Sequence, residues 1–259
     1  MKKWSARKAA TIIMIDNTLL KPGERFDDLQ LSGYHVIQNP DKFSFGMDAV
    51  LLSGFIKVKK GAKVYDMCTG NGIIPILAAA KTKADKIYAV EIQPEVYDMA
   101  ARSIKANGLE GRICLINGDI KESVALVGRD FDAVTCNPPY MPVGTGIINP
   151  DDAKAVARHE VFCTLSDVCA QAAAVLKEGG HFFMVHKPQR LTEIIEAMAA
   201  NGLEAKRLRF VHATIDKKPS MVLIDAVKGG GRELNVEPPI IIYDEEGKYS
   251  EYMRTEFGF

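Results

Sequence analysis

Short apolar runs alternate with longer helical stretches through most of the chain. The apolar runs are rich in branched and aromatic residues, which is typical of strands buried in a parallel sheet. Pro94 and Gly108 mark the start and the end of one helical stretch. The predicted strands are residues 62–66, 86–90, 112–116, 131–136, 181–186, 206–213 and 220–227, and the predicted helices are residues 73–81, 94–107, 165–176 and 191–200, with another beginning near Asp48.

Strands that alternate with helices predict an α/β fold with a doubly wound, mainly parallel sheet. Ahead of this region, two β-like runs between residues 29 and 38 flank Ser32-Gly33 and predict a small hairpin. We therefore divide the chain into an N-terminal arm with a β-hairpin extension, residues 1–40, and one larger domain, residues 41–259. The sequence contains no internal repeat and no low-complexity tract.

The composition is that of an ordinary globular protein, with 47% hydrophobic and 25% charged residues. The 33 Lys and Arg residues match the 33 Asp and Glu residues, so the net charge does not indicate a nucleic-acid-binding protein. Contact with RNA needs a local basic patch, and the strongest candidate combines Arg207, Arg209, Lys217 and Lys218. A charged edge strand is the competing explanation for this cluster.

Cysteine usage and the N-terminus bear on the compartment. None of the five cysteines belongs to a Cys-x-x-Cys pair, which argues against a zinc site, and their odd number fits a reducing compartment. The apolar run at residues 12–15 ends at Asp16 and is too short for a signal peptide or a membrane span. We expect a soluble, cytoplasmic protein that binds no metal.

The strand predicted at residues 131–136 runs into the motif Asn137-Pro138-Pro139-Tyr140. Ligands of open α/β sheets bind beyond the carboxyl ends of the strands, so this motif lies where chemistry is expected. The prolines stiffen the turn, and an NH₂ group can donate to the Asn137 side chain and to the Pro138 carbonyl. Tyr140 can stack on the plane of that group. The motif predicts a site for the exocyclic amine of a nucleobase or for a side-chain amide, with a plain proline-rich turn as the alternative.

A glycine-rich turn follows the first predicted strand. Gly70 and Gly72 permit a tight turn and a close approach of the backbone to a ligand. Pro75 replaces the third glycine of the dinucleotide fingerprint, which disfavours binding of a nicotinamide dinucleotide. Glu91, at the end of the second strand, is placed to accept both hydroxyl groups of a ribose, although a surface glutamate fits there as well.

Three further segments are candidates for ligand contact. Asp119 and Ile120 follow the third strand, where they suit an adenine ring or form a simple turn. The segment from Phe43 to Asp48 predicts either a ligand lid or an amphipathic helix that packs on the sheet. The long loop at residues 141–160 contains Arg158-His159-Glu160, in which His159 also suits a salt-bridged surface position.

The Asn-Pro-Pro-Tyr motif resembles the signature of S-adenosyl-L-methionine-dependent enzymes that methylate exocyclic or amide nitrogens. From about residue 30 to the C-terminus, the chain resembles the bacterial tRNA-valine adenine-N6 methyltransferase group. The segments that carry the resemblance are Phe43-x-Phe45-Gly46-x-Asp48-Ala49-Val50-Leu51-Leu52, Asp66-Met67-Cys68-Thr69-Gly70-Asn71-Gly72, Arg158-His159-Glu160 and Lys218-Pro219-Ser220.

The resemblance implies a cytosolic enzyme that methylates N6 of an adenine beside the anticodon of a tRNA, with S-adenosyl-L-methionine as its cofactor. It also implies a seven-stranded sheet closed by an antiparallel pair, and it favours Phe43 and Phe45 as neighbours of the methionine moiety. The implied catalytic residues are Asn137, Pro138 and Tyr140. The implied cofactor-binding residues are Phe45, Asp48, Asp66, Thr69, Gly70, Asn71, Gly72, Glu91, Asp119, Ile120 and Asn137. The implied substrate-binding residues are Tyr140, Arg158, His159, Lys217 and Lys218.

An Asn-Pro-Pro-Tyr turn also suits enzymes that methylate other substrates. N5 methylation of a glutamine in a protein requires a groove for an extended peptide, whereas N2 methylation of a guanine in ribosomal RNA requires positive surface around Tyr140. A non-catalytic RNA-binding module on a methyltransferase scaffold is the alternative from another class. The intact residues Asp66, Gly70, Gly72, Glu91 and Asn137 argue against such a decayed scaffold.

Overall fold

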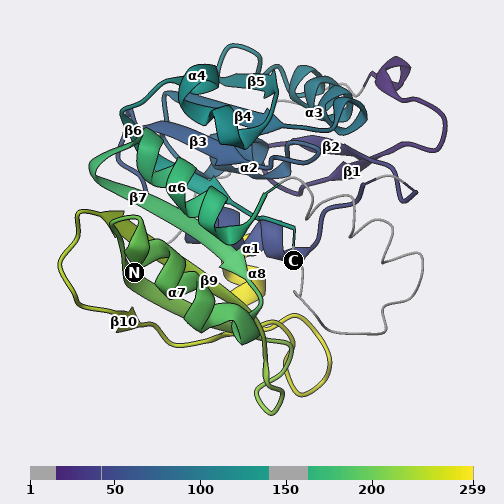
Figure 1. Cartoon of the computed structure of the whole chain (residues 1–259). Helices are drawn as coiled ribbons and strands as arrows, with labels where there is room; N and C mark the ends of the chain where they lie inside the picture. The colour runs from purple at the N-terminus through teal and green to yellow at the C-terminus, as the bar shows by residue number, and fades with distance from the viewer. Residues whose placement is uncertain (1–15, 42, 140–162, 259) are drawn as a thin grey trace.

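The computed structural model describes residues 16–41, 43–139 and 163–258 (Figure 1). Within these residues a nine-stranded sheet has the order β5-β4-β3-β6-β7-β9-β8-β10, with β11 also paired to β8. The strands are β3 Lys63–Met67, β4 Lys86–Glu91, β5 Ile113–Asn117, β6 Phe131–Cys136, β7 Leu176–His186, β8 Leu203–His212, β9 Pro219–Lys228, β10 Asn235–Val236 and β11 Ile240–Ile241.

The sheet is parallel from β5 through β7 and then changes direction. Strand β9 lies antiparallel between β7 and β8, and the short strands β10 and β11 pair with successive parts of β8. The seven long strands therefore form a mainly parallel sheet closed by an antiparallel pair, which confirms the predicted α/β fold. Parallel neighbours require crossover connections, and the helices between these strands supply them.

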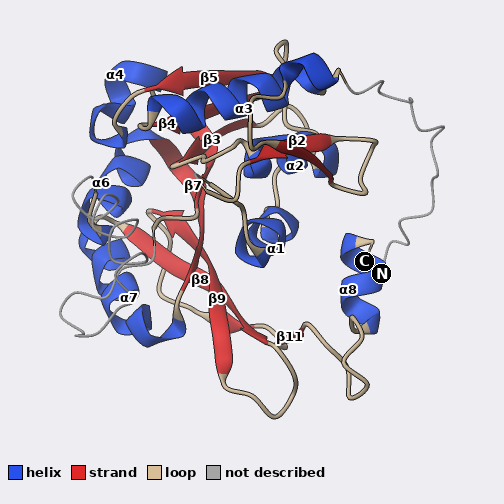
Figure 2. Cartoon of the chain, turned by 90° about the vertical axis from the view of Figure 1, so that its right-hand side faces the viewer, coloured by secondary structure: helices blue, strands red, loops and turns tan. Residues whose placement is uncertain are grey.

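Helices cover both faces of the sheet, as Figure 2 shows. Helices α1, α2 and α8 pack with one apolar core, and α4, α6 and α7 pack with the other. The alternation of side chains along β7 explains the two cores, because Phe183 and Val185 enter the first while Phe182 and Met184 enter the second. The helices are α1 Met47–Phe55, α2 Ile73–Lys81, α3 Pro94–Ala106, α4 Ser123–Val127, α6 Leu165–Val175, α7 Leu191–Ala200 and α8 Glu251–Phe257, with 3-10 turns η1 Asn17–Leu19, η2 Ile120–Glu122 and η3 Pro188–Arg190.

Most predicted elements are confirmed, but the boundary near residue 176 is wrong. Helix α6 ends at Val175, and β7 begins at once, so Gly179 and Gly180 lie inside a strand rather than after a helix. Gly179 has φ +72°, and a Cβ atom on Gly180 would lie 2.8 Å from the Lys177 carbonyl oxygen. The glycines therefore accommodate the irregular start of β7, where its register with β6 shifts.

The predicted hairpin is present, with its first strand earlier than expected. Strands β1, Arg25–Asp28, and β2, His35–Gln38, are antiparallel and form a separate two-stranded sheet. The hairpin is fastened to α3 because Ser103 Oγ accepts a hydrogen bond from the Ile37 amide at 3.0 Å. Asn107 bonds both the N–H and the C=O of His35.

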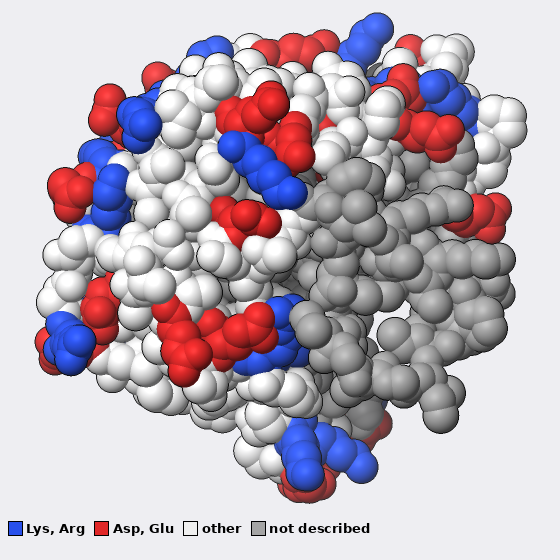
Figure 3. All heavy atoms as spheres, in the orientation of Figure 1, with Lys and Arg blue, Asp and Glu red and all other residues white. Residues whose placement is uncertain are grey.

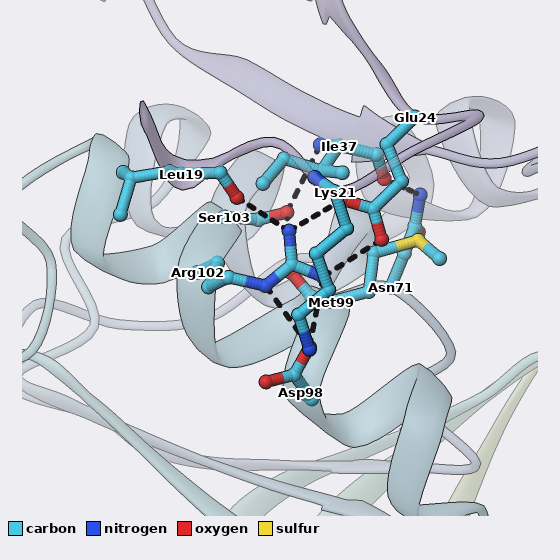
Figure 4. Close-up of polar contacts among 9 residues, drawn as sticks. All are labelled: Leu19, Lys21, Glu24, Ile37, Asn71, Asp98, Met99, Arg102 and Ser103. Atoms are coloured by element: carbon cyan, nitrogen blue, oxygen red, sulfur yellow. Dashed lines mark hydrogen bonds and ion pairs between the residues drawn. The ribbon is translucent and has the colours of Figure 1, made fainter. Parts of the chain in front are cut away.

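Arg102 on α3 anchors the segment that precedes the hairpin (Figure 4). Its guanidinium donates to both carboxylate oxygens of Glu24, at 2.5 and 2.8 Å, and to the Leu19 carbonyl at 2.6 Å. It also donates to Asp98, which Lys21 approaches at 2.6 Å. Burial alone would raise the pKa of Glu24, but the hydrogen bonds from Arg102 and from the Lys21 amide offset it and lower that pKa.

Replacing Arg102 by methionine removes these donors and keeps an aliphatic side chain in place. The Glu24 side chain is only 5% exposed, so its charge would lose its partner in a desolvated position. We expect the free energy of unfolding, measured by chemical denaturation at pH 7, to fall by about 3–5 kcal/mol. Arg25→Met is the control, because the Arg25 side chain is exposed to solvent and its pair with Asp27 should contribute little to stability. Equal losses in the two variants would contradict the anchoring role.

Candidate active site

A cavity of about 310 Å³ lies beyond the carboxyl ends of β3, β4 and β6. This is the edge of an open α/β sheet at which ligands bind, and the volume lies within the range of small-molecule sites. Many of the predicted residues from five separate segments meet in its lining. They are Phe43, Phe45, Asp48, Thr69, Gly70, Glu91, Asp119, Ile120, Asn137 and Pro138.

The glycine turn lines this cavity, and Gly70 lies close to the Phe43 ring. Gly70 has φ +59°, and a Cβ atom there would lie 2.4 Å from the Phe43 ring. Only glycine satisfies both the backbone conformation and the space. The next glycine, Gly72, also has a positive φ and forms the N-cap of α2. The turn therefore brings backbone into the cavity where a ligand can approach it.

Glu91 faces the same turn from the end of β4. Its Oε2 accepts a hydrogen bond from the Gly70 amide and its Oε1 accepts one from the Gln93 amide, both at 2.9 Å. Burial raises the pKa of Glu91. A carboxylate oxygen has room for a second donor, so the side chain can also accept the hydroxyl groups of a ribose.

Asp66 lies behind the cavity wall rather than among the described residues that line it. Its side chain is fully buried and accepts hydrogen bonds from the hydroxyl groups of Thr69, at 2.6 Å, and Thr135, at 2.5 Å. Burial raises the pKa of Asp66 to about 7, although both hydrogen bonds oppose the shift. Asp66 thus joins the glycine turn to β6.

Asn71 also lies outside the described lining. Its Nδ2 donates to the Ile37 carbonyl oxygen at 2.9 Å, and this contact links the glycine turn to the hairpin (Figure 4). Gly72 packs against Ala100 of α3. Direct contact of Asp66, Asn71 and Gly72 with a cofactor stays a prediction, because the structure shows them shaping the turn from behind.

The motif after β6 reaches the opposite wall. Asn137 is partly buried, Pro138 is buried, and both line the cavity. Tyr140, Arg158 and His159 lie outside the described residues. The sequence analysis did not single out Cys68, Gln93 or Cys163, which also line the cavity. Gln93 lies two residues after Glu91, so its position past a strand end was the available signal, whereas Cys163 follows the Arg158-His159-Glu160 motif by three residues and is not itself part of it.

The candidate basic patch divides into two pairs. Arg207 is 11% exposed, pairs with Asp225 at 3.3 Å and donates to the Phe55 carbonyl oxygen. Arg209 donates to the Pro238 carbonyl and the Tyr252 hydroxyl, each at 2.8 Å. These two arginines belong to the packing around β8. Lys217 and Lys218 are exposed in the turn between β8 and β9.

The described surface has no continuous basic field on the face shown in Figure 3, where acidic and basic side chains are interspersed. No helix in the described part of the chain is both long enough and apolar enough to cross a membrane. Among the same residues, no group of three or more His, Cys, Asp or Glu side chains has an arrangement suited to a metal ion.

The fold and this cavity define a class I S-adenosyl-L-methionine-dependent methyltransferase. Residues 54–142 match the TRM5/TYW2 methyltransferase domain. A predicted O-methyltransferase from Agrobacterium tumefaciens superposes with a TM-score of 0.66 at 21% identity, over 82% of this chain and 96% of that one. The adenosine complex of Methanocaldococcus jannaschii Trm5 superposes with a TM-score of 0.57 at 18% identity, over 82% of this chain and 57% of that one.

Sequence relatives define the family more narrowly. A tRNA1(Val) (adenine(37)-N6)-methyltransferase of Shewanella amazonensis is 30% identical over 217 residues, which cover 82% of this chain and 91% of the relative. A Porphyromonas gingivalis protein of the same name is 26% identical over 83% of this chain and 87% of its own length. The chain belongs to the tRNA1(Val) (adenine(37)-N6)-methyltransferase family, which confirms the resemblance and the expected cofactor.

The residues around the cavity fit S-adenosyl-L-methionine. Glu91 suits its ribose, the apolar side chain of Ile120 suits one face of its adenine, and Asp119 can accept from the adenine amino group. Gly70 leaves space against Phe43 for close contact with backbone. When bound, the cofactor supplies an electrophilic methyl group on a sulfonium. Individual contacts of these residues with the cofactor stay predictions.

Gly70→Ala should weaken cofactor binding. The new Cβ atom would overlap the Phe43 ring, so the ring or the turn must shift in the cavity wall. We expect the dissociation constant for S-adenosyl-L-methionine, measured by isothermal titration calorimetry, to rise about tenfold or more. Gly61→Ala is the control, since Gly61 has φ +83° and open space around its Cβ position. An unchanged affinity in the Gly70 variant would show that the contact does not shape the cofactor site.

Asp66→Asn should change how stability depends on pH. The folded protein holds a proton on Asp66 more tightly than the unfolded chain, so ionisation of Asp66 costs stability as the pH rises from about 4 to about 7. Asparagine has no proton to lose over this range. The free energy of unfolding of Asp66→Asn, relative to the wild type, should therefore increase up to about pH 7 and then level off. Denaturant titrations from pH 4 to 8 measure this difference, and parallel curves would contradict it.

Proposed function

We propose that this protein transfers a methyl group to N6 of adenine 37, beside the anticodon of a valine tRNA. The names of its curated relatives support this substrate. The observation that carries the proposal is that Asn137 and Pro138 line the same cavity as Glu91 and Gly70. An amine held at the motif and a cofactor held at the glycine turn would therefore share one site.

The two acceptors of the motif account for the expected chemistry. The adenine amine is a weak nucleophile, because its lone pair is delocalised into the ring. The Asn137 side-chain oxygen and the Pro138 carbonyl would accept its two hydrogens and favour a pyramidal nitrogen whose lone pair faces the methyl group. This binding is stronger in the transition state than in the ground state. Positioning contributes up to about 7–11 kcal/mol in well-oriented reactions, so no dedicated base is required.

We expect the methylated adenine to lie in an unpaired RNA loop. An unpaired adenine avoids most of the few-kcal/mol cost of extruding a base from a duplex. A tRNA substrate also supports the expectation of a cytoplasmic protein. Tyr140 would stack on the adenine, and Arg158 and His159 would contact RNA; these roles rest on the family resemblance. The separation of residues 1–40 as an extension rests on the hairpin pattern and stays a prediction.

A direct experiment tests the substrate. Total tRNA from a strain that lacks this methylation is incubated with the protein and labelled S-adenosyl-L-methionine, and the modified nucleoside is identified by mass spectrometry. The expected product is N6-methyladenosine at position 37. Methylated guanine in ribosomal RNA, or a methylated glutamine in a protein, would transfer the assignment to one of the alternative amino-methyltransferase functions.

Asn137→Ala should slow methyl transfer strongly while cofactor binding survives. The variant loses the side-chain acceptor for the amine, and loss of one preorganised contact of this kind typically lowers kcat by about 10²–10³-fold. Single-turnover rates and calorimetric titration of S-adenosyl-L-methionine separate the two effects. Asn235→Ala, on the exposed strand β10, is the matched control. Transfer at the wild-type rate in Asn137→Ala would overturn the assigned role.

Lys217 and Lys218 lie beyond the same edge of the sheet as Asn137. Strand β9 runs antiparallel to β7 and pairs Val222 with His186, so the turn before β9 projects past the carboxyl end of β7. Two strand spacings, about 10 Å, separate the line of β6 from that of β9. The exposed ammonium groups are therefore near enough to contact phosphates of an RNA bound over the cavity.

The double variant Lys217→Gln/Lys218→Gln should bind tRNA more weakly. If both lysines contact phosphates, the slope of the logarithm of affinity against the logarithm of salt concentration should decrease by about 2. Filter binding at several salt concentrations measures the slope, while the affinity for S-adenosyl-L-methionine should not change. Lys59→Gln/Lys60→Gln is the control, because these exposed lysines precede β3 at the opposite edge of the sheet. The same loss in both double variants would show a non-specific charge effect.

A further inference from the structure

Cys68 has an uncommon backbone conformation for its position. It directly follows β3, and its φ of +56° lies in the left-handed region that disfavours residues with a Cβ atom. Among the described residues, the other non-glycine residues with positive φ are Gln30, Ser32 and Asp130. These three lie in turns beside β1, β2 and β6, whereas Cys68 lines the candidate active site. A strained residue at a functional site calls for a reason why glycine is not used.

The Cys68 thiol joins three segments of the chain. Its side chain packs against the apolar cluster that contains Cys136, and the Cys163 side chain packs against the same cluster. Cys136 is the last residue of β6 and is fully buried, while Cys163 comes directly before Thr164, the N-cap of α6. A glycine at position 68 would relieve the strain but would have no side chain for this packing.

The Cys68 side chain lies next to the start of the Asn-Pro-Pro-Tyr motif. Strands β3 and β6 are parallel neighbours, and Met67 pairs with Cys136. The next residues on the two strands, Cys68 and Asn137, therefore leave the sheet side by side. One step earlier, Asp66 already bonds Thr135 of β6. Going along the two strands toward the cavity, the packing of Cys68 near Cys136 therefore comes after the Asp66–Thr135 hydrogen bond and directly before Asn137.

We propose that Cys68 is a positioning residue that fixes Asn137 relative to the glycine turn. This inference rests on the proposed role of Asn137 in holding the methyl acceptor. A thiol suits the task because it is compact, polarizable and uncharged, so its burial carries no cost of desolvating an ion. The neighbouring Cys136 thiol and burial hold the pKa of Cys68 well above its ordinary value, although the Cys163 thiol opposes the shift. A protonated thiol also does not compete with the amine for the methyl group, since the thiolate is the nucleophile.

Cys68→Gly and Cys68→Ala test the proposal together. Glycine removes the strain and the thiol, so the melting temperature should rise by about 2 °C or more, while kcat falls about tenfold or more. Alanine removes the thiol and keeps the strain, so kcat should fall without a gain in stability. Cys68→Ser should recover part of kcat, because a hydroxyl group can still donate and accept. Cys114→Ala, at an exposed position on β5, is the matched control.

Amide hydrogen exchange gives a readout that does not depend on the substrate. The peptide that covers residues 131–139 should exchange faster at its C-terminal end in Cys68→Gly than in the wild type, and the Asn137 amide reports on the turn directly. Unchanged exchange there, or kcat within twofold of the wild type in both Cys68 variants, would overturn the positioning role. If the wild-type protein makes no N6-methyladenosine, the proposed function fails, and the exchange measurement still decides whether Cys68 holds Asn137 in place.

Discussion

The site depends on the hydrogen bonds that the buried side chain of Asp66 accepts from two threonines. The two Asp66 oxygens accept hydrogen bonds from Thr69 in the glycine turn and from Thr135 in β6. Those segments carry the two parts of the candidate active site that we propose for the cofactor and for the methyl acceptor. Burial makes the ionised form costly, so two hydroxyl donors at a fixed spacing are needed to keep the carboxylate in this position. The geometry of the cavity follows from that requirement.

The hairpin of β1 and β2 supports the same site from outside the main sheet. Ile37 of β2 receives the Asn71 side chain on its carbonyl oxygen and donates its amide to Ser103 of α3. The glycine turn is therefore held from two sides, by Asp66 within the sheet and by the hairpin outside it. Arg102 fastens the preceding segment to the same helix, so a partly buried ionic cluster supports the hairpin that supports the turn.

The chemical requirements of methyl transfer match the arrangement of residues in this site. The reaction needs alignment of nitrogen, methyl group and sulfur more than it needs an acid or a base. The described site offers backbone and side-chain acceptors, carboxylates and apolar walls, and the pKa values of its Cys68 and Cys163 thiols are raised, which keeps them protonated. The stiffness of the proline turn and the close fit of Phe43 on Gly70 supply rigidity without large side-chain networks.

The sequence by itself determined the alternation of strands and helices, the strand that runs into Asn137, and the identity of many residues around the cavity. These features are local, because a buried strand and a glycine turn each need particular residues at consecutive positions. The tertiary structure alone decided which side chains face the cavity. Asp66 and Asn71 belong to the recognised motif, yet both turn away to bond Thr135 and Ile37, while Cys68 and Cys163 enter the lining. Helix α8 and the early start of β7 were also not predicted from the sequence. Packing against segments far away in the sequence stabilises them, and a local residue pattern does not show such contacts.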